Sequence, residues 1–428
     1  MSKPLKLSKL TLKKFKNIRI ENSLRLNGLN ILIGPNGSGK SNLIGVLKFM
    51  RDCLLSSPDP GRGVTDFEEA VIELGDARIL DSTVAPPGVV GFELGFDSAE
   101  MTRRGVHFEL DLMLKGANTN PIVKREVLCD LQPDPGEMTP FYYYKTHDPE
   151  SGTGVVSVYN DTSRKSSRFE KLHDVPVNRL TLSSIPELPE LGNFSPEDTP
   201  AYKVRRQMTE LISGWRFYNA NDMNLKAIRK SEPKIGPADI FLSPSGENLP
   251  LVLDNLIRKD FLFEETINNA MKKILPPTIK IRVVHSGRLR LTAEWYVKGM
   301  NERFYLTDMS DGSVRMLCWA IVLHSPVLPS LLVIDEPETG LHPAWMRTLA
   351  EWIKSASEKT QVIIATHSSD LLDHFTDRYE DVLCFEYDGK AHFTPKRLPE
   401  AELKARLDDG WELGDLYRVG DHAVGWPW

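Results

Sequence analysis

Residues 34–41 read Gly34-Pro35-Asn36-Gly37-Ser38-Gly39-Lys40-Ser41 and match the phosphate-binding loop pattern G-x-x-x-x-G-K-[ST]. The apolar run 29–33 predicts a buried strand before the loop, and residues 42–50 predict a helix after it. The glycines let successive backbone N–H groups turn toward a triphosphate at the N-terminus of that helix, which favours an anion. A glycine-rich turn with a chance Lys-Ser is the alternative, and the complete, correctly flanked pattern disfavours it.

Two side chains of this loop predict further chemistry. Lys40 would reach the β- and γ-phosphates of a bound nucleotide, and Ser41 would ligate magnesium. The stretch therefore predicts a site for a nucleoside triphosphate with Mg²⁺.

The bulk composition is that of a globular protein. The chain has 428 residues, of which 41% are hydrophobic and 26% charged, so we expect a large core in two lobes or in one domain with insertions. The net charge of −6 argues neither for nor against nucleic acid, because a local basic patch can exist on an acidic protein. The N-terminus has no apolar signal region and no run approaches a membrane span, so we expect a cytoplasmic protein without a membrane partner.

The cysteines predict neither a metal ribbon nor a disulfide framework. They lie far apart and form no C-x-x-C pair, which favours buried thiols in a reducing compartment. The four are Cys53, Cys129, Cys318 and Cys384.

Patterns along the chain predict a β-rich first part, a helical middle and a second α/β part. Alternation predicts strands within 5–26, 89–96 and 106–114, and helical periodicity covers 201–230 and 247–275. No heptads run through 115–198, so a long coiled-coil arm is not expected. The predicted division is 1–114 for an N-terminal lobe with the loop, 115–200 for a β- and loop-rich insertion, 201–278 for a helical region and 279–428 for a C-terminal lobe.

A second group of polar residues follows an apolar strand at 330–336. Ligands of parallel α/β sheets sit at the carboxyl ends of the strands, so Asp335 would emerge beside Ser41 and hold magnesium. Glu336 would face the attacking water as its general base, or position that water for in-line attack. A structural role for a lone Asp-Glu pair is weakened by the complete phosphate loop upstream.

Two further segments bear on the same site. Ser310, Asp311, Gly312 and Ser313 open an apolar helix and have N-cap chemistry, and the same exposed amides could grip the γ-phosphate of a nucleotide bound elsewhere. The apolar run 361–366 is followed by His367, at the carboxyl end of another expected strand. A zinc pair of His342 and His367 is an alternative that no ligand spacing supports.

Together these segments resemble the ABC-type head ATPases of the RecF, OLD and SMC group, especially their compact branch. The resemblance implies an α/β fold, an ABC-type P-loop head with a mixed sheet, a β-rich N-terminal lobe with an insertion, and a helical middle region. It implies that Gly34–Ser41 and Asn42 bind ATP as Walker A, that Ser310–Ser313 is the signature, and that Asp335 and Glu336 are Walker B. Glu338–His342 would be the D-loop region, and His367 would contact the γ-phosphate.

The sequence departs from the family pattern at three places. The signature reads Ser-Asp-Gly-Ser rather than Ser-Gly-Gly-Gln, which leaves the strength of nucleotide sandwiching open. The Q-loop glutamine, a further magnesium ligand, has Gln132 as its candidate. About sixty residues follow His367 without an evident acidic cluster, so intrinsic nuclease activity is not expected.

The resemblance implies ATP-dependent dimerisation, with each nucleotide held between Walker A of one copy and Ser310 of the other. The leading functional hypothesis is an ATPase that gates a partner effector, such as a nuclease or toxin, in bacterial anti-phage defence. The alternative is a RecF-like ATPase of DNA repair that uses the basic stretch from Lys3 to Arg19 on duplex DNA. A transporter subunit fits the long middle region less well. The terminal Trp426 and Trp428 would pack on the domain or dock a partner.

Overall fold

The computed structural model describes residues 6–55, 66–97, 105–116, 121–147, 153–159, 168–184, 200–236 and 239–424. Lys3 of the basic stretch and the terminal tryptophans Trp426 and Trp428 lie outside these residues. In the part of the chain that is described, no helix is both long enough and apolar enough to cross a membrane.

The chain forms two units whose segments interleave. The first comprises residues 1–27, 34–215 and 384–396, and the second comprises 28–33, 216–383 and 397–428. The phosphate loop belongs to the first unit, while the strand that leads into it belongs to the second.

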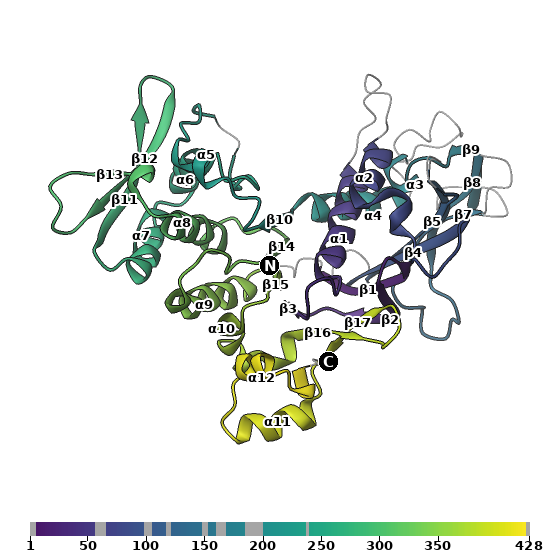
Figure 1. The fold of residues 1–428 in the computed structure, drawn as a ribbon. Coiled ribbons are helices and arrows are strands. Elements are labelled where there is room, and N and C mark those ends of the chain that lie inside the picture. The colour runs from purple at the N-terminus through teal and green to yellow at the C-terminus, as the bar shows by residue number, and fades with distance from the viewer. Residues whose placement is uncertain are drawn as a thin grey trace. The chain divides into compact units, whose positions relative to one another are not determined.

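The first unit is a long, mostly antiparallel sheet with helices on it (Figure 1). Its strands follow the order β17-β2-β1-β4-β5-β6-β7-β8-β9, and only β17 pairs in parallel, with β2. The strands of the predicted insertion continue this sheet outward. The bounds are β1 Lys6–Phe15, β2 Ile18–Arg25, β4 Gly88–Asp97, β5 Val106–Leu114, β6 Ile122–Asp130, β7 Tyr142–His147, β8 Thr153–Tyr159, β9 Phe169–Pro176, β17 Phe393–Arg397, α1 Lys40–Leu55, α2 Asp66–Leu74, α3 Thr181–Ser184 and α4 Pro200–Ser213.

An aromatic cluster fixes α1 on this sheet. The centre of the Phe92 ring on β4 lies 5.7 Å from the centre of the Phe15 ring on β1 and 5.6 Å from that of Phe49 on α1. All three side chains are buried. Because α1 begins at Lys40, this packing sets the position of the helix start that follows the phosphate loop.

The second unit contains the parallel strands. Their order is β10-β14-β15-β3, and β14–β15 and β15–β3 pair in parallel. The remaining strand β16, Val382–Tyr387, begins in this unit and ends in the first. The bounds are β3 Leu29–Ile33, β10 Trp215–Asn219, β11 Thr278–Ser286, β12 Arg290–Val297, β13 Phe304–Tyr305, β14 Leu331–Asp335, β15 Gln361–Ala365, α5 Leu225–Arg229, α6 Leu249–Lys259, α7 Phe263–Ile274, α8 Asp311–His324, α9 Met346–Ser357, α10 Ser369–Asp373, α11 Glu400–Asp408 and α12 Leu413–Val419.

Apolar sequence explains why these elements form the core. Every residue of β3, β14 and β15 is buried, as expected for strands of a parallel sheet covered on both faces. Helix α8 is buried from Ser313 to Leu323, and the indole Nε1 of Trp319 donates to the carbonyl oxygen of Pro337 at 2.9 Å. The helix that starts at the predicted signature is thus tied to the turn after β14.

One expected helix is partly wrong. The helical prediction over 201–230 covers α4 and α5, but residues 215–219 between them form the strand β10. Trp215 and Tyr218 are large aromatic side chains that are buried there. Their residue type favours a pleated surface, and this preference outweighs the helical spacing of the flanking apolar residues.

A buried acid links two elements of the first unit. Glu126 on β6 accepts hydrogen bonds from the hydroxyl of Tyr144 at 2.6 Å and from the backbone N–H groups of Thr181 and Leu182 at 2.7 and 2.8 Å. Burial raises the pKa of Glu126 to about 7, and these donated bonds oppose the rise.

Glu126 gives a prediction for stability against pH. Because the folded pKa lies above the unfolded value, its stabilising contribution is complete below about pH 4 and is lost as the pH rises through about 7. We expect the urea midpoint of the wild type to fall between pH 5 and pH 8.5 by an amount equivalent to about 2–3 kcal/mol more than that of Glu126→Gln. Parallel pH profiles of the two proteins would contradict this assignment.

Candidate active site

The phosphate loop is shaped by its glycines. Gly37 and Gly39 adopt φ values of 78° and 103°, in the left-handed region that other residues rarely enter. A Cβ atom on Gly39 would also lie 2.6 Å from Cγ1 of Ile18. The loop can therefore take this course only with glycine at position 39.

The side chains of the loop are arranged to receive an anion. The Lys40 ammonium is buried and donates to the carbonyl oxygens of Gly34 and Pro35 at 2.7 and 3.0 Å. The hydroxyl oxygen of Ser38 is buried and has no hydrogen-bond partner among the described residues. A buried polar group without a partner is costly, and a phosphate oxygen would supply one. The loop therefore fits a nucleotide phosphate.

The turn between β1 and β2 braces the loop, which the sequence reasoning missed. The side-chain amide of Asn17 donates to the carbonyl oxygen of Gly37 at 2.7 Å, and its oxygen accepts from the Asn42 amide at 3.0 Å. The Lys16 ammonium donates to the Asn42 amide oxygen at 3.1 Å, and burial lowers the pKa of Lys16. No motif signals these contacts in the sequence, because their partners lie 20 to 26 residues apart.

The second unit brings the other predicted residues to one edge of its sheet. In the parallel register Asp335 pairs with Ala365, and Ala365 pairs with Leu32. The carboxyl ends of β14, β15 and β3 therefore lie in one row, where parallel strands place their ligands. Asp335 ends β14 and Glu336 follows it, His367 lies just after β15, and the phosphate loop continues directly from Ile33 at the end of β3.

Glu336 has an unusual backbone conformation. Its φ is 51°, and its N–H donates to the carbonyl oxygen of Ala365 at 2.8 Å. A non-glycine residue in this region costs about 1–3 kcal/mol, and such strain is found mainly where function requires it. The carboxylate is half-buried, and its Oε1 lies 3.9 Å from Nε2 of His367.

Two asparagines after β10 contact both carboxylates. The Asn219 amide donates to Oδ2 of Asp335 at 3.2 Å, and the Asn221 amide donates to Oε2 of Glu336 at 2.8 Å. Sequence reasoning missed them because it placed this segment in a helix. Gln132 is exposed beyond the end of β6, and three strands lie between β6 and β2 in the sheet.

The turn after Glu336 reaches the segment after β15. Oε1 of Glu338 accepts from the hydroxyl of Thr366 at 2.6 Å and from the N–H groups of His367 and Ser368 at 2.9 and 3.1 Å. Burial raises the pKa of Glu338, and the three donated bonds oppose the rise.

The predicted signature forms a capped helix start. Ser310 is the N-cap of α8, and its hydroxyl accepts from the Ser313 N–H at 3.2 Å, as the sequence predicts. Asp311 pairs with Arg229 at 2.7 Å. Gly312 leaves room for Trp345, whose ring would lie 2.8 Å from a Cβ atom at that position. The guanidinium of Arg315 donates to the carbonyl oxygen of Thr339 at 2.6 Å, so α8 also contacts the turn after β14.

The structure does not support the zinc alternative. Nδ1 of His342 accepts from the Ala344 N–H at 3.1 Å and so caps a short helical turn. Within the described ranges, the one group of three possible metal-ligating residues is Asp373, Glu412 and Asp415, which includes neither histidine.

That acidic group corrects one expectation, since carboxylates do cluster after His367. Arg418 offsets part of its charge, since its guanidinium contacts Asp373 and Asp415 at 2.8 and 2.7 Å. The group is therefore explained as an ion-pair network that holds α10 against α12.

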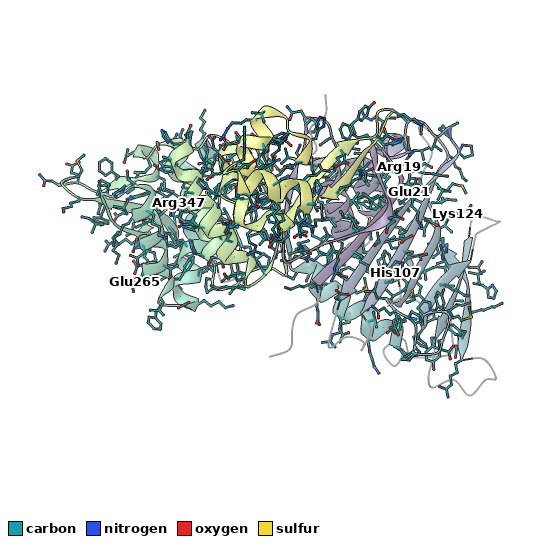
Figure 2. All side chains as sticks on the ribbon, turned by 90° about the horizontal axis from the view of Figure 1, so that it is seen from below. Arg19, Glu21, His107, Lys124, Glu265 and Arg347 are labelled. Carbon is teal, nitrogen blue, oxygen red and sulfur yellow. The ribbon has the colours of Figure 1, made fainter. Side chains whose placement is uncertain are left out.

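The basic stretch of the first unit is partly used in contacts within the fold. Lys13 forms an ion pair with Glu93, and Arg19 lies 3.5 Å from Glu21 on the same strand, β2 (Figure 2). Lys16 is bound to Asn42, as described above. The two ion pairs offset part of the positive charge that the stretch would offer to a phosphate backbone.

Comparison with known proteins identifies the family. Residues 29–373 match the family described as "AAA domain, putative AbiEii toxin, Type IV TA system". The chain belongs to this family. The match runs from β3 through the phosphate loop, the signature, Asp335 and Glu336 to the segment after His367, so these elements fall within one family domain.

Curated relatives and solved structures are similar over different spans. The chain is 34% identical over 119 residues to the phosphate import ATP-binding protein PstB of Malacoplasma penetrans, covering 28% of this chain and 37% of that protein. It is 37% identical over 106 residues to ABC transporter A family member 4 of Arabidopsis thaliana, covering 24% of this chain and 10% of that protein. An Smc head domain with an extended coiled coil, bound to the C-terminal domain of ScpA and derived from Pyrococcus furiosus, aligns over 95% of this chain and 99% of that one, with 12% identity and a TM-score of 0.49.

The family match and the similarity to ATP-binding proteins confirm the predicted resemblance to ABC-type head ATPases. The mixed sheet of the structure agrees with the predicted fold class. The chain spans about a third or less of the length of these curated relatives, which therefore identify its ATP-binding part and no more.

The loop geometry gives a prediction for nucleotide binding. Gly39→Ala forces a Cβ atom into Ile18 and a positive φ onto alanine, so we expect at least a tenfold weaker affinity for a fluorescent ATP analogue. Gly45→Ala on α1 is the control, because its Cβ atom would make ordinary contact with Leu74 at 3.5 Å. Equal affinities of the two variants would show that the glycine at position 39 does not shape the site.

Proposed function

We propose that the protein is an ATPase whose nucleotide is held between two copies of the chain, and whose cycle gates a separate effector. The observation that carries the proposal is the edge of the second unit's sheet, where the strained Glu336 lies between Asn221 and His367. A carboxylate, a hydrogen-bond donor and an imidazole at one edge of a sheet are groups suited to in-line attack of water on a γ-phosphate.

Each residue has a distinct part in the proposed reaction. The loop amides and Lys40 hold the phosphates, and Glu336 takes the proton from the attacking water. His367 contacts the γ-phosphate, and Asn221 keeps the Glu336 carboxylate in place through its hydrogen bond. Ser41 and Asp335 are oxygen ligands suited to Mg²⁺, which when bound would neutralise charge on the phosphates.

The signature supports the proposal that the site is shared. Ser310 caps α8, and the N-terminus of a helix favours an anion. Arg315 ties this helix to the turn that carries Glu336. A second copy would present this start to the nucleotide held by Lys40. ATP would then stabilise the closed dimer, and hydrolysis would release it, because only the closed state contacts the nucleotide from both sides.

The effector is proposed from the family description alone. That description names a putative AbiEii toxin of a type IV toxin–antitoxin system, which favours a role in bacterial defence with a nuclease or toxin as partner. The RecF-like alternative in DNA repair would need the basic stretch on β1 and β2 to bind DNA, and the ion pairs of Lys13 and Arg19 weaken it.

The test is the turnover of Glu336→Gln. The amide cannot accept the proton from water, so we expect kcat to fall about 10²–10⁴-fold while ATP affinity stays close to that of the wild type. The control is Glu351→Gln on the exposed face of α9, where the carboxylate pairs only with surface cations and turnover should not change. Wild-type turnover by Glu336→Gln would exclude the base assignment.

A further inference from the structure

Glu338 makes contacts that the proposed reaction leaves unexplained. One of its oxygens, Oε1, accepts three hydrogen bonds, and all three donors belong to the residues directly after β15. Its other oxygen, Oε2, is buried and has no hydrogen-bond partner among the described residues. Burying a carboxylate in this way is costly, because burial disfavours the charged form and half of the acceptor capacity is unused.

These bonds take the place of the backbone pairing between β15 and β3, which ends at Thr366. The N–H of Thr366 still donates to Leu32 on β3 at 3.1 Å, which continues the parallel pairing by one residue. The next two N–H groups, those of His367 and Ser368, are satisfied by Glu338 instead. The backbone that carries the imidazole is therefore fixed by a side chain from the turn after β14.

The same turn carries Glu336. The N–H of Thr339 donates to the carbonyl oxygen of Glu336 at 3.1 Å, and the Thr339 hydroxyl lies 3.4 Å from Oε2 of Glu336. Glu336 and Glu338 therefore belong to one hydrogen-bonded turn. A movement of that turn would move the Glu336 carboxylate and the His367 backbone together.

We propose that Glu338 is a positioning residue, which holds the His367 imidazole in register with the Glu336 carboxylate through its bonds to Thr366, His367 and Ser368. The inference rests on the proposed roles of Glu336 and His367 in hydrolysis. It adds that one shared turn positions both Glu336, the proposed base, and His367, the proposed contact to the γ-phosphate.

A purely structural role is the competing explanation, and a double-mutant cycle separates the two. Glu338→Ala, His367→Ala and the double variant are compared with wild type by ATPase kinetics and by affinity for a fluorescent ATP analogue. We expect Glu338→Ala to lower kcat roughly tenfold to a hundredfold while the nucleotide Kd changes by less than about threefold. In the His367→Ala background the same change should lower kcat by less than about twofold, because the residue that Glu338 positions is absent.

The outcomes are distinct. Equal losses from Glu338→Ala in both backgrounds would overturn the inference and leave the proposed function standing. Wild-type kcat in His367→Ala would overturn both, since His367 would then have no part in hydrolysis.

Glu338→Gln provides a second, matched readout. Glutamine keeps an acceptor oxygen for the three donors, so kcat should remain within about threefold of the wild type. Its amide nitrogen would lie where Oε2 has no partner, so the Tm should fall. If Glu338 were merely structural, kcat would fall in proportion to Tm in both Glu338→Ala and Glu338→Gln.

Thr366→Val keeps the inference testable if Glu338→Ala does not fold. Valine is nearly isosteric and removes the Thr366 bond to Glu338, together with the hydroxyl that accepts from the Ser368 N–H at 3.0 Å. We expect a loss in kcat of about threefold that disappears in the His367→Ala background. The same threefold loss in both backgrounds would overturn the inference.

Discussion

The parallel pairing of β14, β15 and β3 is the constraint on which the candidate site depends. It places the ends of three strands in one row, although β3 lies about 300 residues before β14 in the sequence, so that Asp335, the segment before His367 and Ile33, which leads into the phosphate loop, share an edge. Every residue of these strands is buried, so a slip of register would place their polar ends in the core. The apolar sequence of the strands thereby fixes the place of the chemistry.

Side-chain hydrogen bonds then fix the positions of the groups at the strand ends and in the phosphate loop. Asn219 and Asn221 hold the two carboxylates after β14, Glu338 holds the backbone of His367, and Asn17 and Asn42 brace the phosphate loop in the first unit. Several of these donors and acceptors are amides or backbone groups, which cannot change charge with pH. The arrangement is therefore preorganised, so that its groups need little rearrangement when charge develops on a phosphate.

The chemistry-bearing residues could be predicted from the sequence because each follows a local pattern. Gly34–Ser41, Asp335, Glu336 and His367 all follow short apolar runs, and the structure places each at a strand end as expected. Ser310 is predicted by the same kind of local signal, since an N-cap acts within three residues.

The residues that the sequence could not reveal act over long separations. Asn219 and Asn221 reach partners 116 and 115 residues away, and nothing in their own neighbourhood marks them. The helical reading of 201–230 concealed β10, because aromatic residues in that segment have a spacing that suits either structure. Gln132 was the only glutamine in a suitable interval of the sequence, and it lies exposed beyond β6. The composition also does not reveal how the two units interleave, because this depends on which strands pair with one another in the folded chain.

The central claim is that Gly34–Ser41 forms half of a nucleotide site and that a second copy supplies the other half. Subunit mixing tests it most directly, with Lys40→Ala disabling the loop and Ser310→Arg disabling the signature, each checked for folding by circular dichroism. Each variant alone should hydrolyse ATP poorly, whereas mixed dimers contain one intact loop facing one intact signature. We expect the mixture to hydrolyse ATP at a rate well above the sum of the rates of the two separate variants. Turnover no greater than that sum, from variants shown to associate, would contradict it.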